Sequence, residues 1–549
     1  MENNIKKSVN NKIRIFIKKN TISIVKKKKL KNETNKIIIV ISKNLISIAK
    51  NFIYFLEKIN YTVLIIHNLL KIHLNDIHNW YIIIYNDRKD GKVPKKHIFY
   101  QIEQSNHKNF DINIMNKYNI IWDFSLKNYD KYSYVPLSKV FYMPIPFYFN
   151  DNIIYDNFEY DIFFYGINNK RQLLILNNLK SKGYNIIFHS RMYGDDRDNF
   201  IKKSKIIINL HYYNNSALET TRFNEVLNFN KLIISETSNH KNDIFNRNLY
   251  NNYVHLIDCI NDDLSNIDIL YNALDLYLSN EKLYNDKIEY IKNNKYKIMD
   301  TTNYFLEKNL LTINLPNKLN INYELKENII YCLSLVETPK RVEMFKKQKI
   351  YINNSNIFEF YPAIKYNPGW KGCALSYVNL ITNAKKYNLK KITICEDDCC
   401  FNNDFIEKYK IINEFLDIIK EWDIFVGVIA DLPTDTTLYK VYKYKGNTFI
   451  QINKMHSTVF NIYNSSVYET IINWDIKTEK RYNQIDQYIK HKNLKLIIPV
   501  PFEFSCLNCD STLWEKNLFD SYNKLFEKSN KVITKLINEF IKTNNIIYL

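Results

Sequence analysis

The sequence predicts an α/β protein of two or three domains, with two parallel-sheet units in its first half. Short runs rich in β-branched residues alternate with helical segments through the first 300 residues, which is typical of parallel sheets. A polar stretch around Pro316 interrupts this pattern, and an acidic triplet then follows a strand in the second half. A chain of 549 residues with 46% hydrophobic residues is long enough for two or three packed domains.

The first unit is expected to begin after a basic segment, residues 1–35. The apolar run Lys36–Ser42 is typical of a buried parallel strand, and Leu45–Lys58 has the spacing of an amphipathic helix. Further strands are expected at residues 61–66, 81–85, 97–103, 120–123 and 140–143. The first strand-to-helix turn contains no glycine, so a dinucleotide-binding fingerprint is absent.

A second α/β unit follows the break at Pro144 and Pro146. A strand ending at Gly166 precedes a helix over Asn168–Lys182. Further strands are expected at residues 185–189, 205–210, 231–235 and 254–257. The sequence therefore predicts two similar α/β units in succession.

Three stretches of residues 36–315 resemble the group 1 glycosyltransferases, especially their CgeB-like branch. They are YQIEQ with IIWDFSLKN, FFYGINNKRQLLILNNLKSKGYNIIF, and INLHYYNNSALETTRFNEVLNFNKLIISE. The resemblance implies a GT-B fold, a double Rossmann unit in which Gly166, Lys170 and Arg171 contact the donor diphosphate. Fixed cations and helix N-terminal amides stabilise a departing phosphate. It also implies that Glu225 holds the ribose hydroxyls of the donor.

The glutamates of this unit depart from the family pattern, which places two of them eight residues apart. Ala217 stands eight residues before Glu225, and Glu219 stands only six before it. A GT-B-like unit that has lost catalysis therefore remains an alternative for the first half.

The second half is organised around the acidic triplet Glu396, Asp397 and Asp398, which follows the strand Lys391–Cys395. Alternation in an extended chain places Glu396 and Asp398 on one face and Asp397 on the other, at a strand end that faces solvent. This arrangement can hold one divalent metal. A helix is expected over residues 374–386. Gly369 and Gly372, two of the chain's eight glycines, precede it and indicate a sharp bend or a closely approaching ligand.

The stretch GxxGCALS and the strand ending in EDD resemble the GT25 glycosyltransferases, the lipooligosaccharide and collagen galactosyltransferases. The resemblance extends to IIYCLSLVETPKR, WDIFVGV, HSTVFNIYNSS and QIDQYI. It implies a GT-A domain, one mixed α/β domain, at residues 328–525, after a linker at 316–327 and before a C-terminal helical part at 526–549. Helical spacing over residues 518–540 predicts a packing helix there. The implied activity is inverting, metal-dependent hexosyl transfer, with a UDP-sugar as the expected donor.

Site residues follow from the same resemblance. Oxygen ligands and phosphates favour Mn²⁺ or Mg²⁺, with Asp398 as the direct ligand and Glu396 beside it. Asp397 and Gly372 would lie on the donor side. Two candidates for the base are left open, because Asp486 is equally explained as a carboxylate at a helix start, and Asp431 is the other acid nearby. His456 would contact the diphosphate or cap a strand.

The net charge of +20 is unevenly distributed, because residues 1–31 contain eleven lysines and arginines and one acid. This segment is expected to be a solvated tail or a peripheral contact with anionic lipid rather than a nucleic-acid site. No apolar run is long enough to span a membrane, and no secretory signal is recognised. The eight cysteines are expected to be reduced thiols, and the location cytoplasmic, soluble or peripheral to a membrane.

Taken together, the sequence predicts a tandem glycosyltransferase that moves hexosyl units from nucleotide sugars to a glycan or glycoprotein acceptor. The alternative is a carbohydrate-binding or scaffold protein whose GT-B-like unit has decayed.

Overall fold

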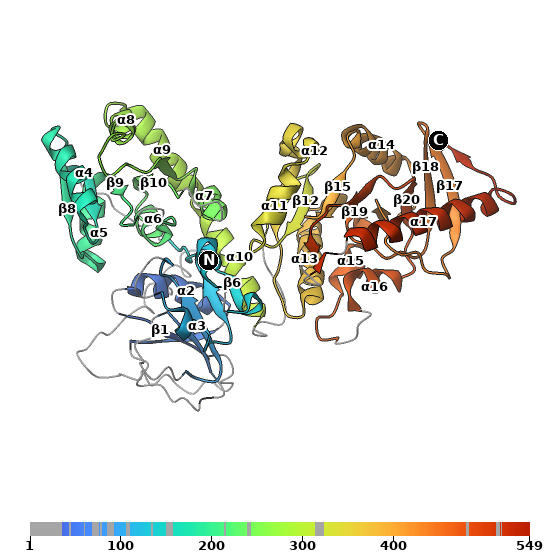
Figure 1. The fold of residues 1–549 in the computed structure, drawn as a ribbon, viewed down its shortest axis with the longest axis horizontal. Coiled ribbons are helices and arrows are strands. Elements are labelled where there is room, and N and C mark those ends of the chain that lie inside the picture. Colours follow the sequence, from blue (N-terminus) through green and yellow to red (C-terminus); the bar gives the residue numbers. More distant parts are fainter. Residues whose placement is uncertain are drawn as a thin grey trace, which may run out of the picture.

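The computed structural model shows two lobes joined near their middle (Figure 1). The part of the chain that it describes comprises residues 36–42, 45–59, 61–67, 76, 79–84, 93–105, 110–132, 135–149, 158–213, 216–238, 243–312, 323–478, 483–511, 516–517 and 519–549. The basic segment at residues 1–35 and residues 316–322 of the expected linker lie outside the described residues. The first lobe contains two sheets, and the second contains one large sheet.

Six parallel strands form the first sheet, in the order β2-β1-β3-β4-β5-β6. Its strands are β1 (Lys36–Val40), β2 (Thr62–Ile66), β3 (Trp80–Ile83), β4 (His97–Gln101), β5 (Ile121–Asp123) and β6 (Val140–Tyr142). The isoleucine run of β1 is buried, as expected for a strand covered on both faces. Helix α2 (Ile46–Lys58) buries one apolar stripe, including Phe52 and Leu56, so the predicted elements of this unit are confirmed. A short helix, α3 (Ile112–Met115), precedes β5.

The second sheet has five parallel strands in the order β11-β10-β9-β7-β8. Its strands are β7 (Tyr160–Tyr165), β8 (Ile186–His189), β9 (Ser204–Asn209), β10 (Leu232–Glu236) and β11 (Val254–Ile257). Its helices are α4 (Lys170–Ser181), α5 (Gly194–Lys203), α6 (Thr220–Leu227), α7 (Ile244–Tyr250), α8 (Asp268–Leu278) and α9 (Glu281–Asn294). Helix α4 begins at Lys170, two residues after the predicted start at Asn168, because Asn169 forms a capping box with Gln172 and so stands just before the first helical residue.

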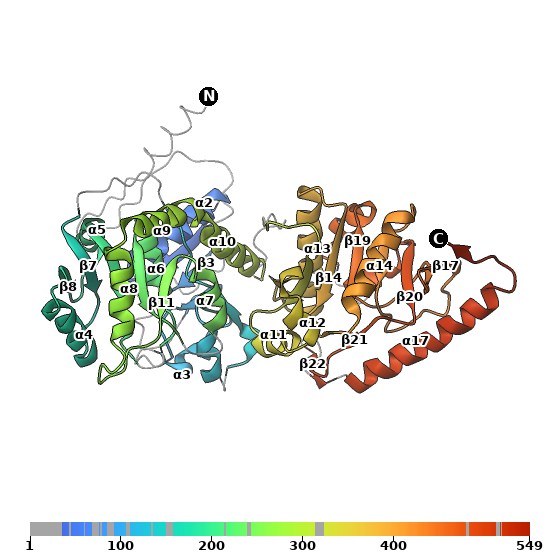
Figure 2. The same cartoon turned by 90° about the horizontal axis from the view of Figure 1, so that it is seen from above.

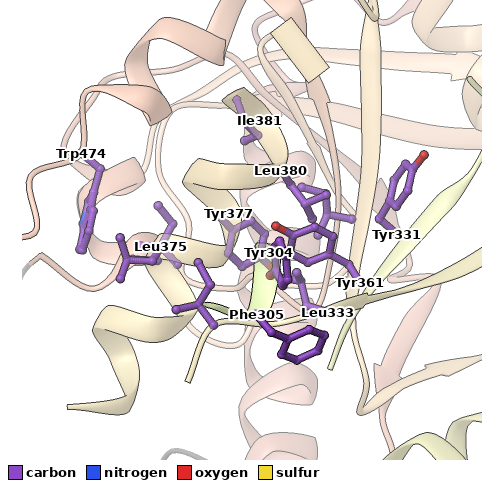
Figure 3. Close-up of a cluster of buried hydrophobic side chains, with 14 of the residues drawn as sticks. Tyr304, Phe305, Tyr331, Leu333, Tyr361, Leu375, Tyr377, Leu380, Ile381 and Trp474 are labelled. Atoms are coloured by element: carbon purple, nitrogen blue, oxygen red, sulfur yellow. The ribbon is translucent and has the colours of Figure 1, made fainter. Parts of the chain in front are cut away.

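Helix α10 (Tyr296–Leu311) connects the two lobes (Figure 2). On one side, the ring of Phe305 packs edge to face on Tyr142 of β6 at 5.1 Å between centroids. On the other side, the ring of Tyr304 packs on Tyr361 of the second lobe at 5.7 Å (Figure 3). One continuous hydrophobic core therefore extends from the first sheet through α10 into the second lobe.

The second lobe contains a nine-stranded mixed sheet in the order β13-β12-β14-β19-β16-β20-β18-β17-β24. Its strands are β12 (Ile330–Ser334), β13 (Phe358–Pro362), β14 (Lys391–Glu396), β16 (Ile424–Val426), β17 (Leu438–Tyr444), β18 (Asn447–Ile452), β19 (Phe460–Asn464), β20 (Leu496–Val500) and β24 (Ile547–Tyr548). Three strands, β13, β12 and β14, run parallel, and β19 is antiparallel to β14. Two small ribbons lie apart, formed by β15 (Cys399–Phe401) with β21 (Phe504–Cys506) and by β22 (Asp510–Ser511) with β23 (Lys516–Asn517).

Helices cover this sheet on both faces (Figure 1). They are α11 (Pro339–Lys346), α12 (Lys349–Asn353), α13 (Gly369–Lys386), α14 (Phe405–Ile418), α15 (Tyr468–Ile472), α16 (Ile485–Lys490) and α17 (Phe519–Phe540). The mixed α/β architecture predicted for this part of the chain is confirmed. The helical spacing of residues 518–540 is confirmed by α17, which starts at Phe519, so the domain boundary expected at 526 falls inside this helix. Strand β24 after it joins the sheet beside β17.

The glycines before the predicted helix at residues 374–386 belong to that helix, because α13 begins at Gly369. A Cβ atom at Gly372 would lie 2.4 Å from the carbonyl oxygen of Ile364. The expected close approach is therefore real, but the approaching group is the protein's own backbone.

Candidate functional site

The acidic triplet lies where β14 ends in the middle of the sheet. Glu396 is the last residue of β14, and Asp397 and Asp398 form the turn to β15. Their environment is more enclosed than the sequence indicates, since Asp397 is only 5% exposed. The expectation of a strand end facing solvent is therefore wrong. Helix α11 and the segment after β21 cover this edge, as the contacts of Arg341 and Leu507 show.

Glu396 is held from the α13 side of the sheet. The Thr458 hydroxyl donates to Glu396 Oε1 at 2.6 Å, and the Tyr377 hydroxyl lies 3.3 Å from the same oxygen. Burial, together with the nearby charge of Asp398, raises the pKa of Glu396 to about 7. This carboxyl group is therefore poised between its two protonation states at neutral pH.

Asp397 points the other way, as the alternation predicted, and both of its oxygens have partners. Ser334 Oγ at the end of β12 donates to Oδ2 at 2.6 Å, and Arg341 Nε donates to Oδ1 at 2.7 Å. Burial raises the pKa of Asp397, and Arg341 opposes that shift. Both side-chain oxygens of Asp397 therefore bind other residues of the protein.

Asp398 shares the same arginine but keeps one oxygen unpartnered. Arg341 Nη2 lies 3.0 Å from Asp398 Oδ2. Asp398 Oδ1 is buried and has no hydrogen-bond partner among the described residues. A buried carboxylate oxygen without a donor is costly, and a cation is one group that would satisfy it.

Asp486 of α16 and His456, in the chain before β19, lie close to each other. Gln487 Nε2 donates to His456 Nδ1 at 2.7 Å, and Asp486 Oδ2 lies 3.9 Å from that same nitrogen. Burial raises the pKa of the Cys373 thiol, and the charges of Glu396, Asp486 and Asp398 add to this. The charges of these three acids therefore all act on the Cys373 thiol.

The other two sequence candidates lie differently. Asp431 is exposed, and its backbone forms a bridge to His456. Gly372 packs against the backbone of Ile364, and its lack of a side chain lets helix α13 approach that segment closely.

Asp398 and Glu396 are the carboxylates that a divalent cation at this position would contact. Within the described ranges, no group of three or more His, Cys, Asp and Glu side chains is arranged to hold a metal by itself. Mg²⁺ and Mn²⁺ in phosphate chemistry are often held by one or two carboxylates together with substrate phosphates. Asp398 Oδ1 and the neighbouring Glu396 fit that smaller requirement.

The candidate residues of the first lobe lie at the carboxyl edge of the second sheet. Gly166 has φ +145°, and a Cβ there would lie 2.9 Å from Arg222 Nη2. Arg222 in turn pairs with Glu219 at 3.1 Å and lies over the ring of Tyr165. Gly166 therefore makes room for an arginine from α6.

Among the described residues, Lys170 and Arg171 differ in whether their side chains are free of contacts with other charged groups of the protein or already bound to them. Lys170 is exposed at the first position of α4. Arg171 pairs with the fully buried Glu236 and also donates to the carbonyl oxygens of His211 and Ile260. Both residues line an open hollow of about 590 Å³, whose remaining lining residues are Asn169, Leu174, Tyr212, Tyr213 and Asp262.

Glu225 lies between the two units of the first lobe. It pairs with Arg197 of α5, and it accepts a hydrogen bond from Ser47 Oγ of α2 at 3.1 Å. Tyr165 donates to its second oxygen at 3.2 Å. Three arginines at this edge, Arg171, Arg197 and Arg222, are thus each paired with a glutamate.

Several of these contacts were not foreseen from the sequence, above all those of Arg341, Ser334, Thr458 and Tyr377. A signal for Arg341 was present, because it follows β12 and the triplet follows β14. Neighbouring parallel strands end at the same edge of a sheet, so residues just after them meet.

Comparisons with known proteins do not assign a family. No protein-family model matches the chain, and no curated protein matches it. Among solved structures it is similar to an α1,3-fucosyltransferase, with 13% identity and a TM-score of 0.30 over 51% of this chain and 93% of that chain. It is also similar to Acinetobacter baumannii MurG (9% identity, TM-score 0.26, 47% of this chain and 95% of that chain). A third is AviGT4, a glycosyltransferase involved in avilamycin A biosynthesis (6%, 0.25, 49% and 98%). TM-scores of this size establish neither a shared fold nor a shared function.

Proposed function

We propose that the chain is a glycosyltransferase that moves a hexosyl unit from a nucleotide sugar to a glycan or glycoprotein acceptor at the acidic site of the second lobe. The observation that carries the proposal is the buried, unpartnered Asp398 Oδ1 beside Glu396. The resemblance of GxxGCALS and EDD to galactosyltransferases supports sugar transfer over other reactions of phosphate esters.

The acidic residues of the site have different roles in the proposed reaction. Asp398 and Glu396 would hold Mn²⁺ or Mg²⁺, which when bound neutralises the charge of the departing nucleotide diphosphate. Asp486, whose charge acts on the Cys373 thiol as those of Glu396 and Asp398 do, serves as the base that removes the proton from the acceptor hydroxyl. Attack by that oxygen on the sugar carbon, opposite the diphosphate, breaks the glycosyl–phosphate bond and inverts the anomeric centre. Asp431 is the second candidate for the base.

The test is donor hydrolysis and transfer by the full chain against a panel of UDP-, GDP- and TDP-sugars, with and without Mn²⁺. Turnover of at least one donor is expected, with loss in EDTA and recovery on adding Mn²⁺. A UDP-sugar is the expected donor. Turnover that persists unchanged in EDTA would contradict the assignment of the reaction to this site.

The first lobe has two candidate functions. As a second transferase, it would bind the donor diphosphate at Lys170 and the N-terminus of α4, with Glu225 on the ribose. The specific observation favouring a carbohydrate-binding or docking role is the pairing of Arg171, Arg197 and Arg222 with glutamates. Cations that are already neutralised attract a diphosphate weakly. Binding of nucleotide sugars in EDTA would support a transferase, and binding of oligosaccharides alone would support the docking role.

A further inference from the structure

We infer that Arg341 is a positioning residue for the proposed metal site, fixing Asp398 so that its oxygen Oδ1 is presented to the cation. This inference rests on the proposed function. Arg341 comes from α11, whereas the carboxylates it contacts follow β14. It is therefore the contact that joins two separate elements at the site.

The guanidinium of Arg341 uses each of its nitrogens. Nε and Nη2 contact Asp397 Oδ1 at 2.7 and 2.5 Å, and Nη2 also lies 3.0 Å from Asp398 Oδ2. Nη1 donates to the carbonyl oxygen of Asp510 at 2.6 Å. A planar fork with fixed donors can connect these groups in one orientation, which a lysine ammonium cannot do.

Other contacts also fix the two aspartates that Arg341 binds. Ser334 Oγ donates to Asp397 Oδ2, so Asp397 cannot rotate away from Arg341. On the other side, the Leu507 amide donates to the backbone oxygen of Asp398 at 2.6 Å. Asp398 is thus held by its backbone and by one side-chain oxygen, which leaves Oδ1 as the only one of its oxygens without a partner among the described residues.

Charge and geometry have opposite consequences for a cation at this site. A guanidinium beside Asp398 repels a metal ion, so its electrostatic effect alone weakens binding. Its geometric effect strengthens binding, because the ligand oxygen needs no rearrangement. Substitution by lysine keeps the charge and removes the fork, so Arg341→Lys isolates the geometric effect.

The experiment measures Mn²⁺ binding to the full chain without donor, from the electron paramagnetic resonance signal of free Mn²⁺. Arg341→Lys is expected to raise the Mn²⁺ dissociation constant about tenfold, as for other residues that orient a metal ligand. Lys340→Gln is the matched control, because Lys340 is the exposed neighbour on the same helix, and its affinity should equal that of the unmodified chain. Ser334→Ala should give a smaller change in the same direction.

The outcomes separate this inference from the proposed function. If the unmodified chain binds Mn²⁺ and folded Arg341→Lys binds it equally well, Arg341 does not position the ligand and the inference fails alone. If the unmodified chain binds no Mn²⁺, the proposed metal site fails and takes the inference with it. Should Arg341→Lys not fold, Ser334→Ala decides, and an unchanged dissociation constant in that variant overturns the inference.

Discussion

The phenol of Tyr304 donates a hydrogen bond to the backbone carbonyl of Pro362, joining helix α10 to strand β13 of the other lobe. Lys308, one turn further along α10, donates to the carbonyl of Ala363 at 3.1 Å. In return, Lys365 donates to the carbonyl of Val140 in β6 at 2.7 Å. The first lobe and the second lobe therefore share polar contacts as well as one core, and fragments cut at the linker would each expose part of it.

Substitution of Tyr304 tests this junction. Tyr304→Phe leaves the Pro362 carbonyl without its donor in a buried position, so unfolding should cost about 1–3 kcal/mol less. Chemical denaturation followed by tryptophan fluorescence and circular dichroism measures the change. Tyr296→Phe on the exposed face of the same helix is the control and should be neutral. Two well-separated unfolding transitions in the unmodified chain would contradict a shared core.

Asp398→Asn tests the metal ligand. The amide keeps the size of the side chain and one oxygen but removes the charge that a divalent cation requires, so Mn²⁺-dependent turnover should fall at least 100-fold, while thermal unfolding changes little. Steady-state kinetics with a Mn²⁺ titration measures the change. Asp404→Asn, an exposed acid shortly after β15, serves as the control. Normal metal-dependent turnover in Asp398→Asn would refute the site.

Mn²⁺ affinity should depend on pH through Glu396. Its pKa, raised to about 7 mainly by burial, means that the carboxyl is largely protonated at pH 6 and ionised at pH 8. A metal binds the ionised form, so affinity should be weaker at the lower pH, by roughly tenfold between pH 8 and pH 6. Mn²⁺ titrations at these two values measure it. In Glu396→Gln, binding should be weaker and no longer depend on this titration; an unaltered pH dependence would assign the effect to another group.

The sequence predicted the positions of the strands of the first lobe, where periodicity was strong. The isoleucine run of β1 and the amphipathic spacing of α2 each determine one element with little help from the rest of the chain. The hairpin of β17 and β18 was not predicted, although Lys445 and Gly446 at its turn both have positive φ, as a two-residue hairpin loop requires. The lysine–glycine pair is the sequence signal for this hairpin.

The sequence predicted the position of Glu396, Asp397 and Asp398 at the end of a strand, but not their surroundings. Alternation placed Asp397 opposite Glu396, which the contacts with Ser334 and Thr458 confirm. Burial depends on segments far away in the chain, such as residues 505–510, and no local pattern reveals them. For the same reason, the pairing of Arg171 with Glu236 could not be read from sequence. The functional roles of these residues remain predictions.

Two substitutions decide which acid is the base. Asp486 accepts a hydrogen bond from the Gln487 amide at the start of α16, and asparagine retains an oxygen for that contact. Asp486→Asn should leave donor binding intact and lower transfer about 100- to 10,000-fold, as expected when a general base is lost. Asp431→Asn should remain close to the unmodified chain. Calorimetry with the donor and product analysis with the acceptor give the two values, and a loss of donor affinity in Asp486→Asn would move this residue to the nucleotide side.

The final prediction concerns the first lobe and uses Lys170. Because the two lobes share a core, the experiment uses the full chain, with Asp398→Asn silencing the second site and EDTA removing metal. If the first lobe is a transferase, a nucleotide sugar should still bind, because a fixed cation and the amides of α4 replace the metal. Lys170→Ala should then weaken binding about tenfold, which corresponds to roughly 1.4 kcal/mol.

The choice of Lys170 follows from the contacts of its neighbour. Arg171→Ala would leave the fully buried Glu236 with two backbone amide donors but without its ion-pair partner, at a cost of about 3–5 kcal/mol, so lost binding in that variant could result from unfolding. Lys180→Ala, at the other end of α4, is the matched control. Isothermal calorimetry measures the affinities. If no nucleotide sugar binds under these conditions, the first lobe is not a second transferase, and a docking or carbohydrate-binding role is the one that its paired arginines support.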